Sequence, residues 1–81
     1  MGTIDKVIDI VREIAGYEKD KVKPDTSLRR ELELDELDIV ELVIALEEEF
    51  GIEIDDLEVD KLGDSPASIV VYLAEEYHIT P

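Results

Sequence analysis

The sequence contains no cysteine, and only one histidine is present among its 81 residues. Without cysteine the chain can form neither a disulfide framework nor a thiolate zinc site, which fits a reducing compartment. No apolar run approaches the roughly 20 residues that a membrane-spanning helix needs, and the N-terminal MGTIDKVIDIV does not have the pattern of a signal peptide. We therefore expect a soluble, cytoplasmic, monomeric protein made of one small domain, residues 1–81, with no membrane association.

Basic residues are scarce in the second part of the chain. Residues 1–30 hold seven basic against six acidic residues, whereas residues 31–81 hold Lys61 alone against seventeen acidic ones, and the formal net charge is −15. Nucleic acid and anionic membranes would be repelled by this half and are not expected as partners. Basic protein surfaces would be attracted to it, mainly through faster association. The alternative is that the acidity only keeps the protein soluble.

The N-terminal region predicts one helix followed by a long loop. Apolar residues recur at helical spacing over residues 3–15, and Thr3 is a candidate cap for the start of this helix. Residues 17–35 contain turn-forming residues and read as a connection. Leu28 and Leu32 are expected to enter the core and to anchor it. Connections of this length are uncommon in a small domain and are often functional.

The rest of the chain predicts two more long helices and a short one. The second helix is expected over residues 36–50 and ends at Gly51. A short helical element is expected over residues 55–61, and Ser65 with Pro66 should start the last helix. No segment alternates with a period of two, so no strand is expected. The predicted fold class is all-α, a small bundle of three long helices plus one short helix.

The expected second helix has two apolar sides. At 100° per residue, one side collects Ile39, Leu42, Val43, Leu46 and Phe50, and the other collects Leu37, Val40 and Ile44. Three helices cannot easily bury both sides. The second side is flanked by the acidic residues Asp38, Glu41, Glu47 and Glu48. An exposed apolar strip with an acidic rim is typical of a protein docking surface. The alternative is that this second side packs under the long loop.

The start of the second helix resembles the acyl carrier protein family. The chain reads Asp35-Glu36-Leu37 followed by DIVELVIALEEEF, and the family motif is Asp-Ser-Leu followed by D-x-V-E-L-V-x-A-L-E-E-E-F. The resemblance covers nearly the whole chain. It implies a helical bundle that is not an enzyme and that carries acyl chains as thioesters on a 4'-phosphopantetheine arm. The partners it implies are phosphopantetheinyl transferase and acyl-chain-processing enzymes with basic surfaces. The implied recognition surface comprises Asp35, Leu37, Asp38, Val40, Glu41, Ile44, Glu47 and Glu48.

Two positions depart from the family pattern. Glu36 stands at the position of the attachment serine, where a hydroxyl nucleophile is needed, so we expect no phosphopantetheine on this chain. Glu33 follows Leu32, where the family often has glycine, which leaves the path of the end of the loop open. The other hydroxyls considered lack the Asp-x-Leu context of the motif; these are Thr26, Ser27, Ser65 and Ser68.

Three interpretations of Glu36 remain open at this stage. The chain is either an acyl carrier protein of type II fatty-acid, related lipid or polyketide biosynthesis with a blocked attachment site, or a pseudo-carrier that acts as a cofactor-free interaction or regulatory module. In a third interpretation, compatible with both, the carboxylate partly mimics the phosphodiester of the loaded arm. A carboxylate at the start of a helix is favourable, so the fold should tolerate it.

The remaining polar and aromatic residues predict no further site. His78 has no nearby nucleophile and is expected to lie in a frayed tail. The acidic residues from Asp55 to Asp60 do not have the spacing of an EF-hand loop, and no metal site is expected. Tyr17, Tyr72 and Tyr77 are scattered and form no stacking platform for nucleic acid.

Overall fold

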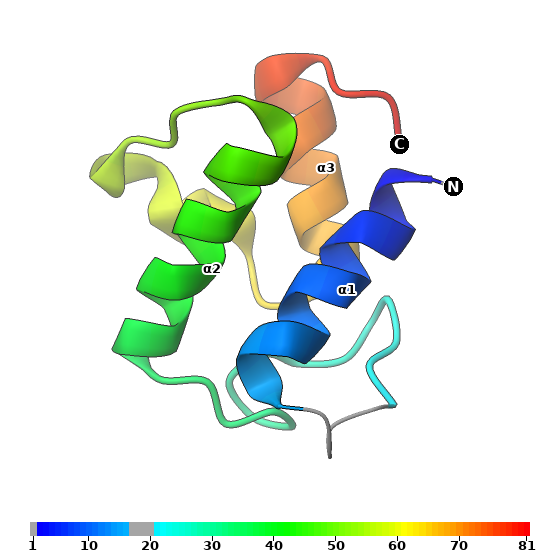
Figure 1. Cartoon of the computed structure of the whole chain (residues 1–81). Helices are drawn as coiled ribbons and strands as arrows, with labels where there is room; N and C mark the ends of the chain where they lie inside the picture. The colour runs from blue at the N-terminus through cyan, green and yellow to red at the C-terminus, as the bar shows by residue number, and fades with distance from the viewer. Residues whose placement is uncertain (1, 17–20) are drawn as a thin grey trace.

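The computed structural model describes residues 2–16 and 21–81 and contains four helices in these ranges (Figure 1). The α-helices are α1 (Thr3–Ala15), α2 (Glu36–Phe50) and α3 (Pro66–Tyr77), and the 3₁₀-helix η1 (Asp56–Leu62) lies between α2 and α3 in the chain. No strand occurs in the described ranges. The prediction of an all-α bundle with three long helices and one short helix is therefore confirmed. None of the helices described in the structure is long and apolar enough to cross a membrane.

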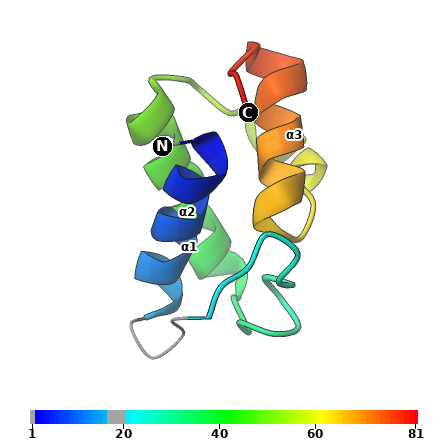
Figure 2. The same cartoon turned by 90° about the vertical axis from the view of Figure 1, so that its right-hand side faces the viewer.

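The bundle is arranged around α1, which packs against both α2 and α3 (Figures 1 and 2). Residues 21–35 wrap around one end of the bundle, and the two chain termini lie close together towards the other end. There the Thr3 hydroxyl donates a hydrogen bond to the backbone oxygen of Thr80. Gly2 is the N-cap of α1, so the prediction that Thr3 caps this helix is wrong: its side chain binds the C-terminal segment instead.

The core draws fully buried side chains from the three α-helices and from the long loop. The apolar ones are Val7, Val11, Leu28, Leu42, Leu46, Ile69 and Leu73. Leu28 and Leu32 are both buried, as expected, so the loop is part of the packed structure. Each buried leucine stabilises the fold by about 1.5–3 kcal/mol relative to an exposed one. The loop is therefore held in place by its own hydrophobic contacts.

Hydrogen bonds tie the same loop to the start of α3. The backbone N–H of Leu28 donates to the backbone oxygen of Asp64 at 2.8 Å, and the N–H of Ala67 donates to the oxygen of Pro24 at 2.9 Å. The Asp64 carboxylate accepts from the Ser27 hydroxyl and from the backbone N–H of Arg29. Burial acts to raise the pKa of Asp64, but the hydrogen bonds from Ser27 and Arg29 and the charge of Arg29 outweigh it and lower that pKa. These hydrogen bonds hold the loop against the start of α3.

The C-terminal part of α3 differs from expectation at three residues. Tyr72 is buried, and its ring meets the ring of Tyr77 edge to face at 5.8 Å, so these two tyrosines are not scattered. Burial, then the hydrogen bonds with Tyr77 and Glu58, raise the pKa of Tyr72. His78 is not frayed: it adopts a left-handed conformation as the C-cap of α3, and its N–H donates to the oxygen of Ala74. Tyr17 lies outside the described residues.

Candidate functional site

The start of α2 is closed by two aspartates. The Asp35 carboxylate accepts from the backbone N–H of Asp38 at 2.9 Å, and the Asp38 carboxylate accepts from the backbone N–H of Asp35 at 3.0 Å. This reciprocal capping satisfies N–H groups that a helix start leaves free. Glu36, the first residue of the helix, has an exposed side chain and takes no part in the cap. The side chain at position 36 is therefore exposed and independent of the capping hydrogen bonds.

Glu33 has the backbone conformation that glycine favours. Its φ is 56°, in the left-handed region, where a non-glycine residue costs about 1–2 kcal/mol. The neighbours Leu32 and Leu34 are both buried, while Glu33 itself is exposed. The left-handed residue thus lies between two side chains that both enter the core. The absence of glycine has not removed this conformation from the end of the loop.

The second apolar side of α2 is exposed. The exposed fractions are 75% for Leu37, 54% for Val40 and 49% for Ile44. The alternative that these residues pack under the long loop is wrong, because all three side chains are exposed. The loop is hydrogen-bonded to Asp64, just before α3, instead. We call Leu37, Val40 and Ile44 the apolar strip.

The acidic residues beside the apolar strip fall into two kinds. Glu41 and Glu48 are exposed, and neither carboxylate accepts a hydrogen bond within the described part of the chain. Asp38 caps the helix, and the carboxylate of half-buried Glu47 accepts a 2.7 Å hydrogen bond from the backbone N–H of Ile54. The predicted acidic residues therefore include two that also hold the backbone of α2 and of the segment after it.

An open depression of about 650 Å³ lies between the start of α2 and η1. Its lining includes Arg29, Glu36, Val40 and Val59. A smaller depression of about 150 Å³ shares Val40 and Val59 with it and continues towards Ile44. The sequence interpretation did not include η1 as the second wall. The three-residue spacing of Asp56, Val59 and Leu62, which suits a 3₁₀-helix, was the available signal.

The hydroxyl groups of the loop and of α3 are engaged elsewhere. The Thr26 hydroxyl accepts from the N–H of Lys23, and the Ser27 hydroxyl donates to Asp64. Ser65 caps α3, and the Ser68 hydroxyl is within hydrogen-bond distance of the backbone oxygens of Leu62 and Ser65. Within residues 2–16 and 21–81, no group of three or more metal-ligating side chains is arranged to hold an ion.

An exposed residue at the first position of a capped helix, beside an open depression and an uncovered apolar strip, is the arrangement of a carrier domain. The chain matches the phosphopantetheine attachment site family over residues 5–73 and belongs to it. The resemblance to acyl carrier proteins is thereby confirmed. Domains of this family carry phosphopantetheine, act together with partner enzymes and are not catalytic themselves.

The surroundings of Glu36 have room for a phosphopantetheine arm, but the Glu36 side chain does not have the hydroxyl group to which the arm is attached. The depression of about 650 Å³ leaves room beside the start of α2 for a flexible chain. The attachment bond, however, joins the arm to a hydroxyl oxygen, and Glu36 offers a carboxylate. The residues that are present therefore support no reaction that uses the phosphopantetheine arm.

Proposed function

We propose that this chain is an acyl carrier protein of type II fatty-acid biosynthesis, or of a related lipid or polyketide pathway, in which Glu36 blocks attachment of phosphopantetheine. The observation that carries this proposal is the exposed apolar strip, which begins at the residue after position 36 in a chain of the phosphopantetheine family. A carrier needs its attachment residue and its docking residues on one face. In this proposal position 36 lies on the same face of α2 as the apolar strip.

In this proposal the partner enzymes bind α2 through two kinds of contact. The exposed carboxylates of Glu41 and Glu48 attract basic partner surfaces and raise the association rate. Burial of the apolar strip then stabilises the complex at about 25 cal/mol for each Å² of apolar surface that the partner covers. Three further acidic residues contribute charge and also form hydrogen bonds with the backbone at the two ends of α2; these are Asp35, Asp38 and Glu47.

The blocked state follows from the chemistry of position 36 and from the other hydroxyls. A carboxylate is a poor nucleophile towards the pyrophosphate of the cofactor precursor, and the mixed anhydride that it would form is readily hydrolysed. The side-chain oxygens of Ser27, Ser65 and Ser68 already take part in hydrogen bonds that hold the loop and α3. These bonds support the proposal that no other hydroxyl replaces the missing serine. We expect the chain to act in the cytoplasm as a monomer of one domain.

A second candidate function is a cofactor-free interaction or regulatory module. The observation that favours it is Glu36 itself, whose exposed carboxylate places a negative charge where a loaded carrier has its phosphodiester. Such a module would occupy the carrier site of a partner enzyme without delivering an acyl chain. Both candidate functions use the same face of α2.

The docking face is tested with the Glu36→Ser chain as substrate of a broad-specificity phosphopantetheinyl transferase. Val40→Ala in that chain should raise the KM on the order of ten-fold, the scale expected when an interface anchor is truncated. Leu57→Ala is the control, because Leu57 on η1 is exposed to 89%, more than Val40 at 54%, and lines neither of the two depressions beside α2 nor a third one, between η1 and α3. Equal KM values for the two variants would contradict docking at the apolar strip.

A further inference from the structure

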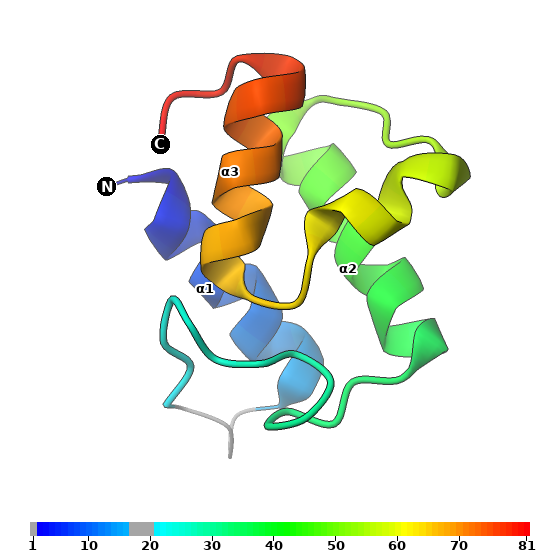
Figure 3. The same ribbon diagram turned by 180° about the vertical axis from the view of Figure 1, so that it is seen from behind.

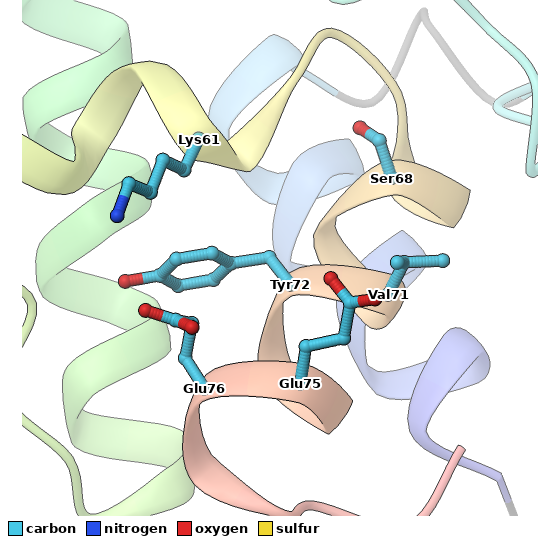
Figure 4. Close-up of a pocket in the computed structure, with 6 residues that line it drawn as sticks. All are labelled: Lys61, Ser68, Val71, Tyr72, Glu75 and Glu76. Atoms are coloured by element: carbon cyan, nitrogen blue, oxygen red, sulfur yellow. The ribbon is translucent and has the colours of Figure 1, made fainter.

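A depression of about 460 Å³ lies between η1 and α3, away from the apolar strip. Figure 3 shows η1 and α3 next to each other, and Figure 4 shows the lining residues, which are Lys61, Ser68, Val71, Tyr72, Glu75 and Glu76. It shares no lining residue with the two depressions beside α2. From η1, Val59 lines the two depressions beside α2, whereas Lys61 lines the depression beside α3. Side chains two positions apart in a 3₁₀-helix point in different directions. The surface is therefore distinct from the docking face on α2.

The apolar part of this depression is formed by Val71 and Tyr72. Val71 is 55% exposed although it lies in the middle of α3. The Tyr72 ring is only 3% exposed, and its hydroxyl donates to the Glu58 carboxylate at 2.9 Å, so the ring is held in one position. A single exposed valine is ordinary on a protein surface. Here the exposed valine lies in a depression whose wall is fixed by the buried Tyr72, and it offers contact to an aliphatic chain.

The charged part of the depression has an excess of negative charge. Glu75 and Glu76 are both exposed, and within residues 2–16 and 21–81 no basic side chain forms an ion pair with either. Lys61 is the cation on the η1 side, but its ammonium nitrogen lies 3.9 Å from a carboxylate oxygen of Glu58, which offsets its charge. In Figure 4, Lys61 and Glu76 lie on opposite sides of the Tyr72 ring.

The position of the two glutamates in α3 strengthens the preference for a cation. Both lie in the last turn of the helix, which contains no basic residue. The C-terminal end of a helix carries a partial negative charge, so carboxylates are unfavourable there and a cation is favourable. A positive group from outside would therefore interact with two carboxylates and with the helix end.

We propose that the depression between η1 and α3 is a second docking site, which binds an arginine side chain of a partner protein. The aliphatic stem of the arginine lies against the exposed side chain of Val71, and its guanidinium group reaches Glu75 and Glu76. Arginine suits the site because its planar group donates several hydrogen bonds at once, and an ammonium group acts as a point charge. A carrier bound in this way keeps the α2 face free for an enzyme.

The test is a titration of the 15N-labelled chain with N-acetyl-arginine amide, followed by NMR. We expect saturable shifts of the backbone amides of Val71, Tyr72, Glu75 and Glu76. N-acetyl-norleucine amide supplies a similar stem without the charge, and guanidinium chloride supplies the charge without the stem. Both should bind at least about three-fold more weakly, the scale of one surface ion pair or a few apolar contacts.

Two pairs of variants make the test specific. Replacing Glu75 and Glu76 together by glutamine should raise the Kd for N-acetyl-arginine amide roughly three-fold or more. The matched control replaces Glu49 and Glu53 by glutamine, two exposed glutamates outside both proposed docking sites, and should leave the Kd unchanged. Equal weakening in the two double variants would show general attraction to an acidic surface and would overturn the proposal. The absence of saturable shifts at the four amides would overturn it as well.

Discussion

The carboxylate of Glu47 on α2 accepts a 2.7 Å hydrogen bond from the backbone N–H of Ile54, seven residues later. Ile54 is buried, so this N–H has little access to water. Glu47→Ala should destabilise the fold by about 1–3 kcal/mol, because a partly buried donor loses its partner. Glu48→Ala next to it should change the stability by less than about 0.5 kcal/mol. Urea unfolding of both variants measures the difference, and equal stabilities would refute a structural role for Glu47.

This relationship also decides which carboxylates test docking most clearly. Reversal of the charge at Glu47 would disturb the connection between α2 and η1 as well as any partner contact. Glu41 and Glu48 are exposed and are therefore the better positions for charge reversal.

Glu33→Gly should stabilise the protein. A non-glycine residue at a φ of 56° costs about 1–2 kcal/mol, whereas glycine loses about 0.5–1 kcal/mol through its greater freedom in the unfolded chain. The net gain is expected to lie between about 0 and 1.5 kcal/mol. Arg30→Gly, three residues earlier at an exposed position where φ is not positive, should instead destabilise. Thermal unfolding of the two variants compares them; a lower Tm for Glu33→Gly would contradict the stated cost.

Gly63→Ala should be strongly destabilising. Gly63 has a φ of 76° and a ψ of −153°, a region that is open almost only to glycine. An added Cβ atom would also lie 2.7 Å from the Cβ atom of Ser68. We expect a loss on the order of 3 kcal/mol in the free energy of unfolding.

Gly51→Ala is the matched control for Gly63→Ala. Gly51 also has a positive φ, 64°, but an added Cβ atom there would meet nothing within 4 Å. Its loss should be about 1 kcal/mol, from the backbone conformation alone. Similar losses at the two positions would show that neither the backbone conformation of Gly63 nor its contact with Ser68 adds a further cost.

Asp64→Asn should weaken the protein in a pH-dependent way. The pKa of Asp64 is lowered in the folded state, so its carboxylate adds stability above the unfolded-state pKa of about 3.9. That contribution is lost as the pH falls through the folded-state pKa. At pH 7 the variant should be less stable by about 1 kcal/mol, the value of a typical hydrogen bond.

The check on Asp64 is the difference in unfolding free energy between the unaltered chain and the variant, measured from neutral to acidic pH. The difference should shrink below a pH of about 4. Asp60→Asn on η1, where the aspartate is exposed, should show little difference throughout. A constant difference for Asp64→Asn down to acidic pH would contradict the assignment.

The helices could be predicted because their ends carry local signals. Asp35 and Ser65 cap α2 and α3, Pro66 occupies the first position of α3, and Gly51 ends α2. These residues act on the backbone beside them, so the sequence alone was sufficient. Ser65 and Pro66 start α3 as predicted.

The features that were left open or missed depend on contacts between distant segments. The exposure of the apolar strip depends on where the long loop runs, and that path is fixed by the hydrogen bonds that Ser27, Leu28 and Arg29 donate to Asp64. The burial of Tyr72 depends on η1, whose Glu58 accepts its hydroxyl hydrogen bond. Helical periodicity predicts neither the path of the loop nor the contact between Tyr72 and η1. The identity of residue 36, by contrast, could be read directly from the motif.

The most direct test of the central claim is mass spectrometry of the intact chain after incubation with coenzyme A and a broad-specificity phosphopantetheinyl transferase. The unaltered chain should show no change in mass, because Glu36 offers no hydroxyl. The Glu36→Ser variant, under the same conditions, should gain the mass of one phosphopantetheine arm. A gain of that mass by the unaltered chain, or none by the variant, would contradict the account of a carrier blocked at position 36.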